Sequence, residues 1–182
     1  MKANRTVLTA VVIVLLVITG WWLFRRGGRA QSTDLVATFD GAEKRPNAEA
    51  FQVIDAELNG DRKKAIFTTP ASRLIWRMRV PDDGWLKVSL GMKPEAWDKE
   101  GDGVLFRVGV SDGRTYDELF NQHLDPFSNK GDRRWIPVTV DLSMYAGEQV
   151  ELIFNTNRSL PGKGDDGRND LALWGAPEVV IR

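Results

Sequence analysis

Apolar and polar residues alternate over most of the chain, and a period of two is typical of β-strands with one buried face. Beyond residue 33 no stretch of ten or more residues has the spacing of an amphipathic helix. The pattern predicts strands at residues 73–80, 86–90, 104–110, 136–142, 150–154 and 171–181, with weaker candidates at 34–39, 51–58 and 64–68.

Turn residues separate these runs. Asn59-Gly60, Asp83-Gly84 and Asp112-Gly113 are dipeptides that tolerate the positive φ angles of tight turns. About nine short strands without intervening helices indicate two stacked sheets, since a parallel α/β sheet needs crossover helices. We therefore expect an all-β protein, a jelly-roll β-sandwich over residues 34–182.

The N-terminus has a different character. Residues 7–24 (VLTAVVIVLLVITGWWLF) are uncharged and mostly apolar, and as a helix they would reach about 27 Å, close to the hydrocarbon thickness of a bilayer. Arg25 and Arg26 follow directly. We interpret 1–6 as a short basic N-terminus, 7–24 as a transmembrane signal anchor and 25–33 as a flexible linker.

A cleavable signal peptide is the alternative, because Gly28-Arg29-Ala30 has the small-x-small form of a cleavage site. The apolar run is longer than a usual signal core, which favours the uncleaved anchor. Basic residues on the two sides nearly balance, and N-terminal spans commonly act as signal anchors. We therefore expect a single-pass protein of the cell membrane whose C-terminal domain lies outside the cytoplasm, in a periplasmic or extracellular space.

The charge balance bears on the partner. Lys and Arg number 25, as do Asp and Glu, but the first 30 residues hold five basic residues and no acidic one. The rest therefore carries 20 basic and 25 acidic residues, a net charge of −5. A nucleic-acid partner is not expected, because such binders gather positive charge. The absence of cysteine excludes disulfides and thiol nucleophiles.

Catalytic motifs are scarce. His123 is the single histidine, and no Gly-x-Ser-x-Gly elbow accompanies it. A glycan hydrolase needs only two carboxylates at a set separation, which a sequence does not reveal. We expect no enzymatic activity and keep a glycan hydrolase as a third hypothesis.

Two loops are rich in oxygen donors, which calcium prefers. Asp98, Glu100 and Asp102 alternate and Gly103 follows at the sixth position, but Gly109 stands where a calcium loop places its bidentate Glu. The alternative is that Asp, Asn and Gly are simply loop residues. If the domain takes a cofactor, we expect calcium, held by Asp98, Glu100, Asp102, Asp165, Asp166 and Asp170.

Two aromatic residues lie outside the alternating pattern. Trp97 stands in a charged loop (KPEAWDKEGD) and Tyr116 follows a predicted turn, whereas Trp76 and Trp174 fit the core. Flat aromatic faces beside carboxylates are typical of sugar sites. Alternatively, Trp97 packs against the edge of the sandwich. The predicted ligand-binding residues are Trp97, Tyr116, Asp98, Glu100 and Asp125.

Three segments carry a resemblance to a known family. Residues 85–113 contain G-V-x-F-x-V-x-V and a D-G turn, 133–156 contain D-L-S-x-Y-A-G, and 169–181 contain D-x-A-x-W. Together they resemble successive strands of galactose-binding-like jelly-roll domains, in particular carbohydrate-binding modules of the NPCBM type, and the resemblance covers about 100 of the 182 residues. It implies a non-catalytic sandwich that binds glycan through loops at one end, often beside a structural calcium.

The expected function is thus a membrane-anchored binding module of the cell envelope that recognises glycan. The 182 residues show no catalytic domain beside the sandwich. This favours an alternative, an accessory or scaffold subunit that binds a protein partner in an envelope glycan-assembly or export complex.

Overall fold

The computed structural model describes residues 32–158 and 166–182, and Ser32–Arg182 form a compact unit. The predicted N-terminus (1–6), the predicted membrane segment (7–24) and most of the predicted linker (25–33) lie outside the described residues. Among the residues that are described, no helix has the length and apolar character needed to span a bilayer. The helical pieces there are single 3₁₀ turns at Phe39–Gly41, Ala48–Ala50, Pro94–Ala96, Lys130–Asp132 and Ser143–Tyr145.

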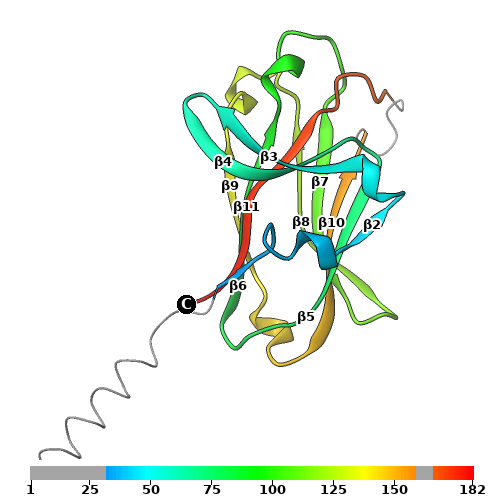
Figure 1. The fold of residues 1–182 in the computed structure, drawn as a ribbon, viewed down its shortest axis with the longest axis vertical. Helices are drawn as coiled ribbons and strands as arrows, with labels where there is room; N and C mark the ends of the chain where they lie inside the picture. The colour runs from blue at the N-terminus through cyan, green and yellow to red at the C-terminus, as the bar shows by residue number, and fades with distance from the viewer. Residues whose placement is uncertain (1–31, 159–165) are drawn as a thin grey trace, which may run out of the picture. The chain divides into compact units, whose positions relative to one another are not determined.

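The predicted all-β sandwich is confirmed (Figure 1). One antiparallel sheet has the order β3-β4-β11-β6-β9, with β1 added beside β11, and the other has the order β2-β5-β10-β7-β8. The strands are β1 Thr33–Asp34, β2 Glu43–Arg45, β3 Phe51–Leu58, β4 Asp61–Thr68, β5 Ser72–Arg79, β6 Gly84–Met92, β7 Val104–Ser111, β8 Tyr116–Leu124, β9 Ile136–Asp141, β10 Gln149–Asn157 and β11 Ala172–Ile181.

The core lies between the two sheets and is built from the alternating apolar positions. Trp174 of β11, at 1% exposure, contacts two rings of the opposite sheet, with centroids 5.0 Å from Phe106 and 4.5 Å from Phe154. Trp76 of β5 adds an edge contact to Phe154 at 5.0 Å. Edge and tilted contacts at these separations are favourable aromatic geometries, so both predicted core tryptophans are confirmed.

One strand prediction was wrong, and two strands were missed. Residues 34–39 form only the end of β1 and a turn, because the Asp34 carboxylate accepts hydrogen bonds from the amides of Val36 and Ala37 and bends the chain. β2 and β8 were not predicted. β2 is a three-residue edge strand (EKR) without an apolar position, and β8 is an edge strand whose alternation is broken by a bulge opposite Val108 and Gly109.

Five connections between the sheets lie at one end of the sandwich. Ala172 pairs with both Thr68 and Met92, Val104 pairs with Leu124, and Arg45 pairs with Arg73 at the start of β5. The β2–β3, β4–β5, β6–β7, β8–β9 and β10–β11 connections therefore all emerge there. We call this the loop end, and its described segments are 46–50, 69–71, 93–103, 125–135, 158 and 166–171.

A second apolar cluster covers the outer face of the larger sheet. Trp135 contacts Leu58, Ala65 and Leu173, and its indole N–H donates to the Asp61 carbonyl at 2.9 Å. The ring occupies space that a Cβ at Gly175 would need, since such an atom would lie 2.6 Å from Trp135 Cζ3. The glycine is therefore required by close packing.

We expect Gly175→Ala to lower the free energy of unfolding by about 1–3 kcal/mol, because the added methyl group overpacks this cluster. Gly41→Ala is the matched control, since a Cβ there has nothing within 4 Å. Urea unfolding followed by tryptophan fluorescence measures both. Equal stabilities for the two variants would contradict the packing role of Gly175.

Candidate functional site

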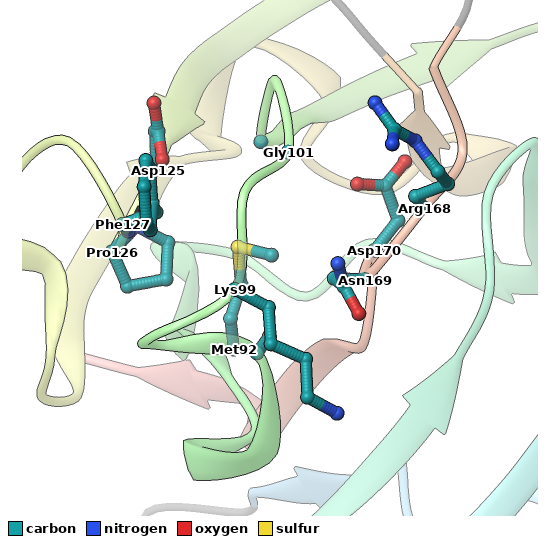
Figure 2. Close-up of a pocket in the computed structure, with 11 residues that line it drawn as sticks. Met92, Lys99, Gly101, Asp125, Pro126, Phe127, Arg168, Asn169 and Asp170 are labelled. Atoms are coloured by element: carbon teal, nitrogen blue, oxygen red, sulfur yellow. Dashed lines mark hydrogen bonds between the residues drawn. The ribbon is translucent and has the colours of Figure 1, made fainter.

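Three segments of the loop end surround a small cavity (Figure 2). The first lies between β6 and β7, the second follows β8 and the third precedes β11. The cavity has a volume of about 10 Å³, which suits one water molecule or one ion and no sugar ring. Its lining residues are Met92, Ala96, Lys99, Gly101, Gly103, Asp125, Pro126, Phe127, Arg168, Asn169 and Asp170.

Direct contacts fix the three segments to one another. The Arg133 guanidinium donates to the carbonyls of Pro126 at 2.8 Å and Trp97 at 2.6 Å, and it pairs with Asp98 at 3.0 Å. The Asn169 amide donates to the Glu100 carbonyl at 2.9 Å. These contacts join the β6–β7 loop to the segments on both of its sides, so the rim of the cavity is preorganised.

The second segment is held by its own carboxylates. Asp125 Oδ1 accepts from the amides of Phe127 and Ser128 at 3.2 and 3.1 Å. Asp132 Oδ2 in turn accepts from the Asp125 amide at 2.9 Å. Asp125 therefore lies at the loop end, as its place after β8 predicts, and it shapes the turn that carries Phe127.

The structure brings the two predicted calcium loops together but does not assemble all six predicted ligands. The Asp98 side chain is 87% exposed and pairs with Arg133, and the Glu100 side chain is exposed. Asp166 forms a bidentate pair with Arg168, whose hydrogen bonds lower the pKa of Asp166 to about 2. Asp165 lies outside the described residues.

Two of the predicted ligands are enclosed. Asp170 is 3% exposed and lines the cavity. Asp102 lies between Gly101 and Gly103, which also line it, and Asp102 Oδ1 is buried without a hydrogen-bond partner among the described residues. The part of the chain that the structure describes holds no group of three or more Asp, Glu, His or Cys side chains suited to a metal ion.

Trp97 packs against the sandwich. Its indole N–H donates to the Met92 carbonyl at 2.9 Å, and its ring contacts the cluster around Trp135. This is the alternative given by the sequence, in which Trp97 covers the edge of the larger sheet. Half-burial leaves part of the ring at the surface, so a sugar contact by Trp97 stays a prediction.

Tyr116 lies far from the other predicted ligand residues. It begins β8, whereas Asp125 follows the last residue of the same strand. Nine residues of strand at ~3.3 Å each separate the two by about 30 Å. The five predicted ligand-binding residues therefore do not form one site: Trp97, Asp98, Glu100 and Asp125 gather at the loop end, and Tyr116 does not.

Phe127 is the residue that sequence reasoning missed. It lines the cavity, and 44% of it is exposed, which is unusual for a large apolar side chain in this domain. The signal is present in the sequence, because D-P-F-S-N-K-G places an aromatic ring among turn residues with no alternating neighbours that would bury it.

His123 has a structural contact. Its Nε2 lies 2.7 Å from the Asp102 carbonyl oxygen, and a Cβ at Gly103 would lie 2.8 Å from the same nitrogen. The ring thus bridges β8 to the β6–β7 loop.

Comparison with known proteins gives relatives by sequence and by structure. No family model matches the chain. An uncharacterized protein of Archaeoglobus fulgidus is 41% identical over 101 residues, which cover 55% of this chain and 25% of that protein. The matched part is thus a quarter of the length of that relative.

Solved structures of carbohydrate-binding modules have the same fold. CBM51 from Clostridium perfringens GH95, in complex with methyl-galactose, gives a TM-score of 0.52 at 15% identity and covers 82% of this chain and 99% of its own. TmCBM61 in complex with beta-1,4-galactotriose also gives 0.52, at 11% identity, and covers 82% and 94%. The CBM51-2 and INT domains of Clostridium perfringens ZmpB give 0.52 at 16% identity, covering 85% and 28%.

At these identities the likeness establishes the fold. The sandwich has the jelly-roll fold of these carbohydrate-binding modules.

Proposed function

We propose that this protein is a non-catalytic module of the cell envelope that binds glycan through its loop end. The observation that supports this most is the convergence of three loops, in a carbohydrate-binding-module fold, on a rim that carries an exposed aromatic ring and several polar side chains. Sugars present C–H faces to aromatic rings and hydroxyls to polar groups, and this rim offers both.

Phe127 supplies the apolar contact in this proposal. It projects from a turn that Asp125 and Asp132 hold in place, so little conformational entropy is lost when a ligand binds. Lys99 and Asn169 stand around the same cavity and offer N–H donors to sugar hydroxyls. Asp98 and Glu100, both exposed on the adjoining loop, offer acceptors.

We also propose that the cavity takes a calcium ion, held by fewer residues than the sequence predicts. Asp170 and Asp102 would provide carboxylate oxygens, and backbone carbonyls and water would complete the shell, a donor set that suits calcium. Asp170 is 3% exposed and lines the cavity, whereas the Asp98 side chain is 87% exposed. The ion would act structurally by tying the loop before β11 to the loop after β6.

Membrane attachment through residues 7–24 is part of the proposal, with the sandwich outside the cytoplasm. It rests on the length and apolar character of that segment and on the Trp21-Trp22 pair at its end. Protease added to intact spheroplasts should cut the exposed domain. A domain that stays uncut until the cells are lysed would refute this orientation.

Phe127→Ala should abolish most binding on a glycan array and weaken binding of beta-1,4-galactotriose about tenfold in calorimetry, because the sugar loses its apolar contact surface. Met144→Ala is the matched control: Met144 is 85% exposed and lies in the β9–β10 connection, away from the loop end. It should bind as the wild type does.

Two outcomes would change the conclusion. Equal binding by wild type and Phe127→Ala would remove Phe127 from the site. A blank array, together with co-purification of one stoichiometric membrane protein, would replace glycan binding by the alternative of an accessory subunit.

Calcium is tested by thermal unfolding with 2–5 mM CaCl₂ or with excess EDTA, concentrations of about that order being ample for an extracellular site. We expect a higher melting temperature with calcium, because a ligand that binds only the folded state stabilises it. Asp170→Asn should remove the difference, whereas Asp98→Asn should keep it. Identical melting curves for the wild type in the two buffers would disprove the site.

A further inference from the structure

A second surface with binding chemistry lies on the outer face of the smaller sheet and borders the loop end, since Ala71 is among its lining residues. It is a groove with a volume of about 320 Å³, within the range of small-molecule sites. Arg45 of β2, Arg73 of β5, and Asn155 and Asn157 of β10 line it. None of these residues belongs to the cavity described above.

Strand register places arginines in one row across this face. Arg45 pairs with Arg73, Arg73 with Asn155, and Asn155 with Arg107 of β7. Residues that pair directly in antiparallel strands share a face about 5 Å apart. Three arginines therefore occupy one row of paired positions, in a domain whose net charge is negative.

Arg73 differs from its neighbours in how its charge is balanced. Arg45 pairs with Glu43, and Arg107 pairs with Glu118. No carboxylate among the described residues lies within ion-pair distance of Arg73. Its Nε donates instead to Asn155 Oδ1 at 2.7 Å, and Asn155 is only 6% exposed. A buried amide thus orients the guanidinium and leaves its two terminal nitrogens available in the groove.

Acceptor capacity lies in the same groove. Asn157 Oδ1 is buried and has no hydrogen-bond partner among the described residues. Burial of an amide oxygen without a hydrogen-bond donor costs free energy. A ligand hydroxyl that donates to Asn157 Oδ1 would remove this cost and so strengthen binding.

Tyr116 extends this surface. Its ring lies over Gly109, where a Cβ would come within 2.4 Å of Tyr116 Cε2, and its hydroxyl lies 3.4 Å from Asn155 Nδ2. Burial raises the pKa of the Tyr116 hydroxyl, against the opposing effect of Arg107. The Tyr116 side chain is 39% exposed, so part of its ring is available to a ligand beside the arginines.

The geometry points to a second glycan subsite here, selective for a sugar residue that carries an oxyanion, either a carboxylate or a sulfate. The terminal nitrogens of Arg73 would bind two oxygens of the anion as a fork, Asn157 would accept a ring hydroxyl, and Tyr116 would contact the next sugar. The inference rests on the proposed glycan-binding function but uses none of the loop-end residues.

The test measures affinity of the full chain, by calorimetry, for three trisaccharides: trigalacturonate, a sulfated galactotriose and neutral beta-1,4-galactotriose. We expect at least one acidic trisaccharide to bind more tightly than the neutral one and to weaken as salt rises. Arg73→Gln should raise its Kd at least tenfold and leave neutral galactotriose unchanged, and Arg73→Lys, which keeps the charge without the fork, should fall between.

Two variants serve as controls. Arg79→Gln removes the same charge from the same face of β5, six residues or about 20 Å away, and should bind acidic sugar normally. Phe127→Ala should weaken the neutral sugar alone.

Several results would overturn the subsite. One is normal affinity of Arg73→Gln for both acidic probes. Another is equal binding of poly-L-glutamate, which would indicate charge attraction without sugar recognition. If the wild type binds neutral galactotriose but neither acidic probe, the subsite alone is wrong. If it binds no sugar at all, the proposed function fails with it.

Discussion

The contact of Trp174 with Phe106 and Phe154 is the interaction on which the rest of the structure depends. It joins β11 of one sheet to β7 and β10 of the other, at the centre of both. Asn169 and Asp170 lie two to three residues before β11, and Gly103 lies immediately before β7. The packing that holds the sheets together therefore also sets the spacing of the loops around the cavity, and rigid strands position a site built from irregular segments.

The fold was largely predictable because its signal is local. Alternation with period two marks most of the strands, although β11 is buried over several consecutive residues, and the Asn59-Gly60 turn has the positive φ angles that its residues predict. Edge strands carry less of this signal. β8 presents polar residues on both faces and contains a bulge, and β2 has no apolar residue. Both are edge strands, which are more exposed to solvent than central strands and so need fewer apolar residues.

The site was less predictable because it depends on distances between segments. The sequence offers both packing and sugar contact for Trp97, and nothing near it in the sequence shows that it packs against the cluster of Trp135 and Leu173. Tyr116 and Asp125 are nine residues apart, and only the recognition of β8 as one continuous strand shows that they lie at its opposite ends. Carboxylate composition suggests two calcium loops, but it does not show that Asp98 pairs with Arg133 and Asp166 with Arg168.

The short β1 strand has a consequence for how such a domain is built into longer proteins. Thr33 and Asp34 pair with Val179 and Glu178, so the polypeptide enters and leaves the sandwich side by side, at the end of β11 remote from Ala172. Flanking modules joined at these two points would share one pole of the domain, and the opposite pole would stay open to solvent. The sandwich can thus be inserted into a larger polypeptide while its loop end still faces outward.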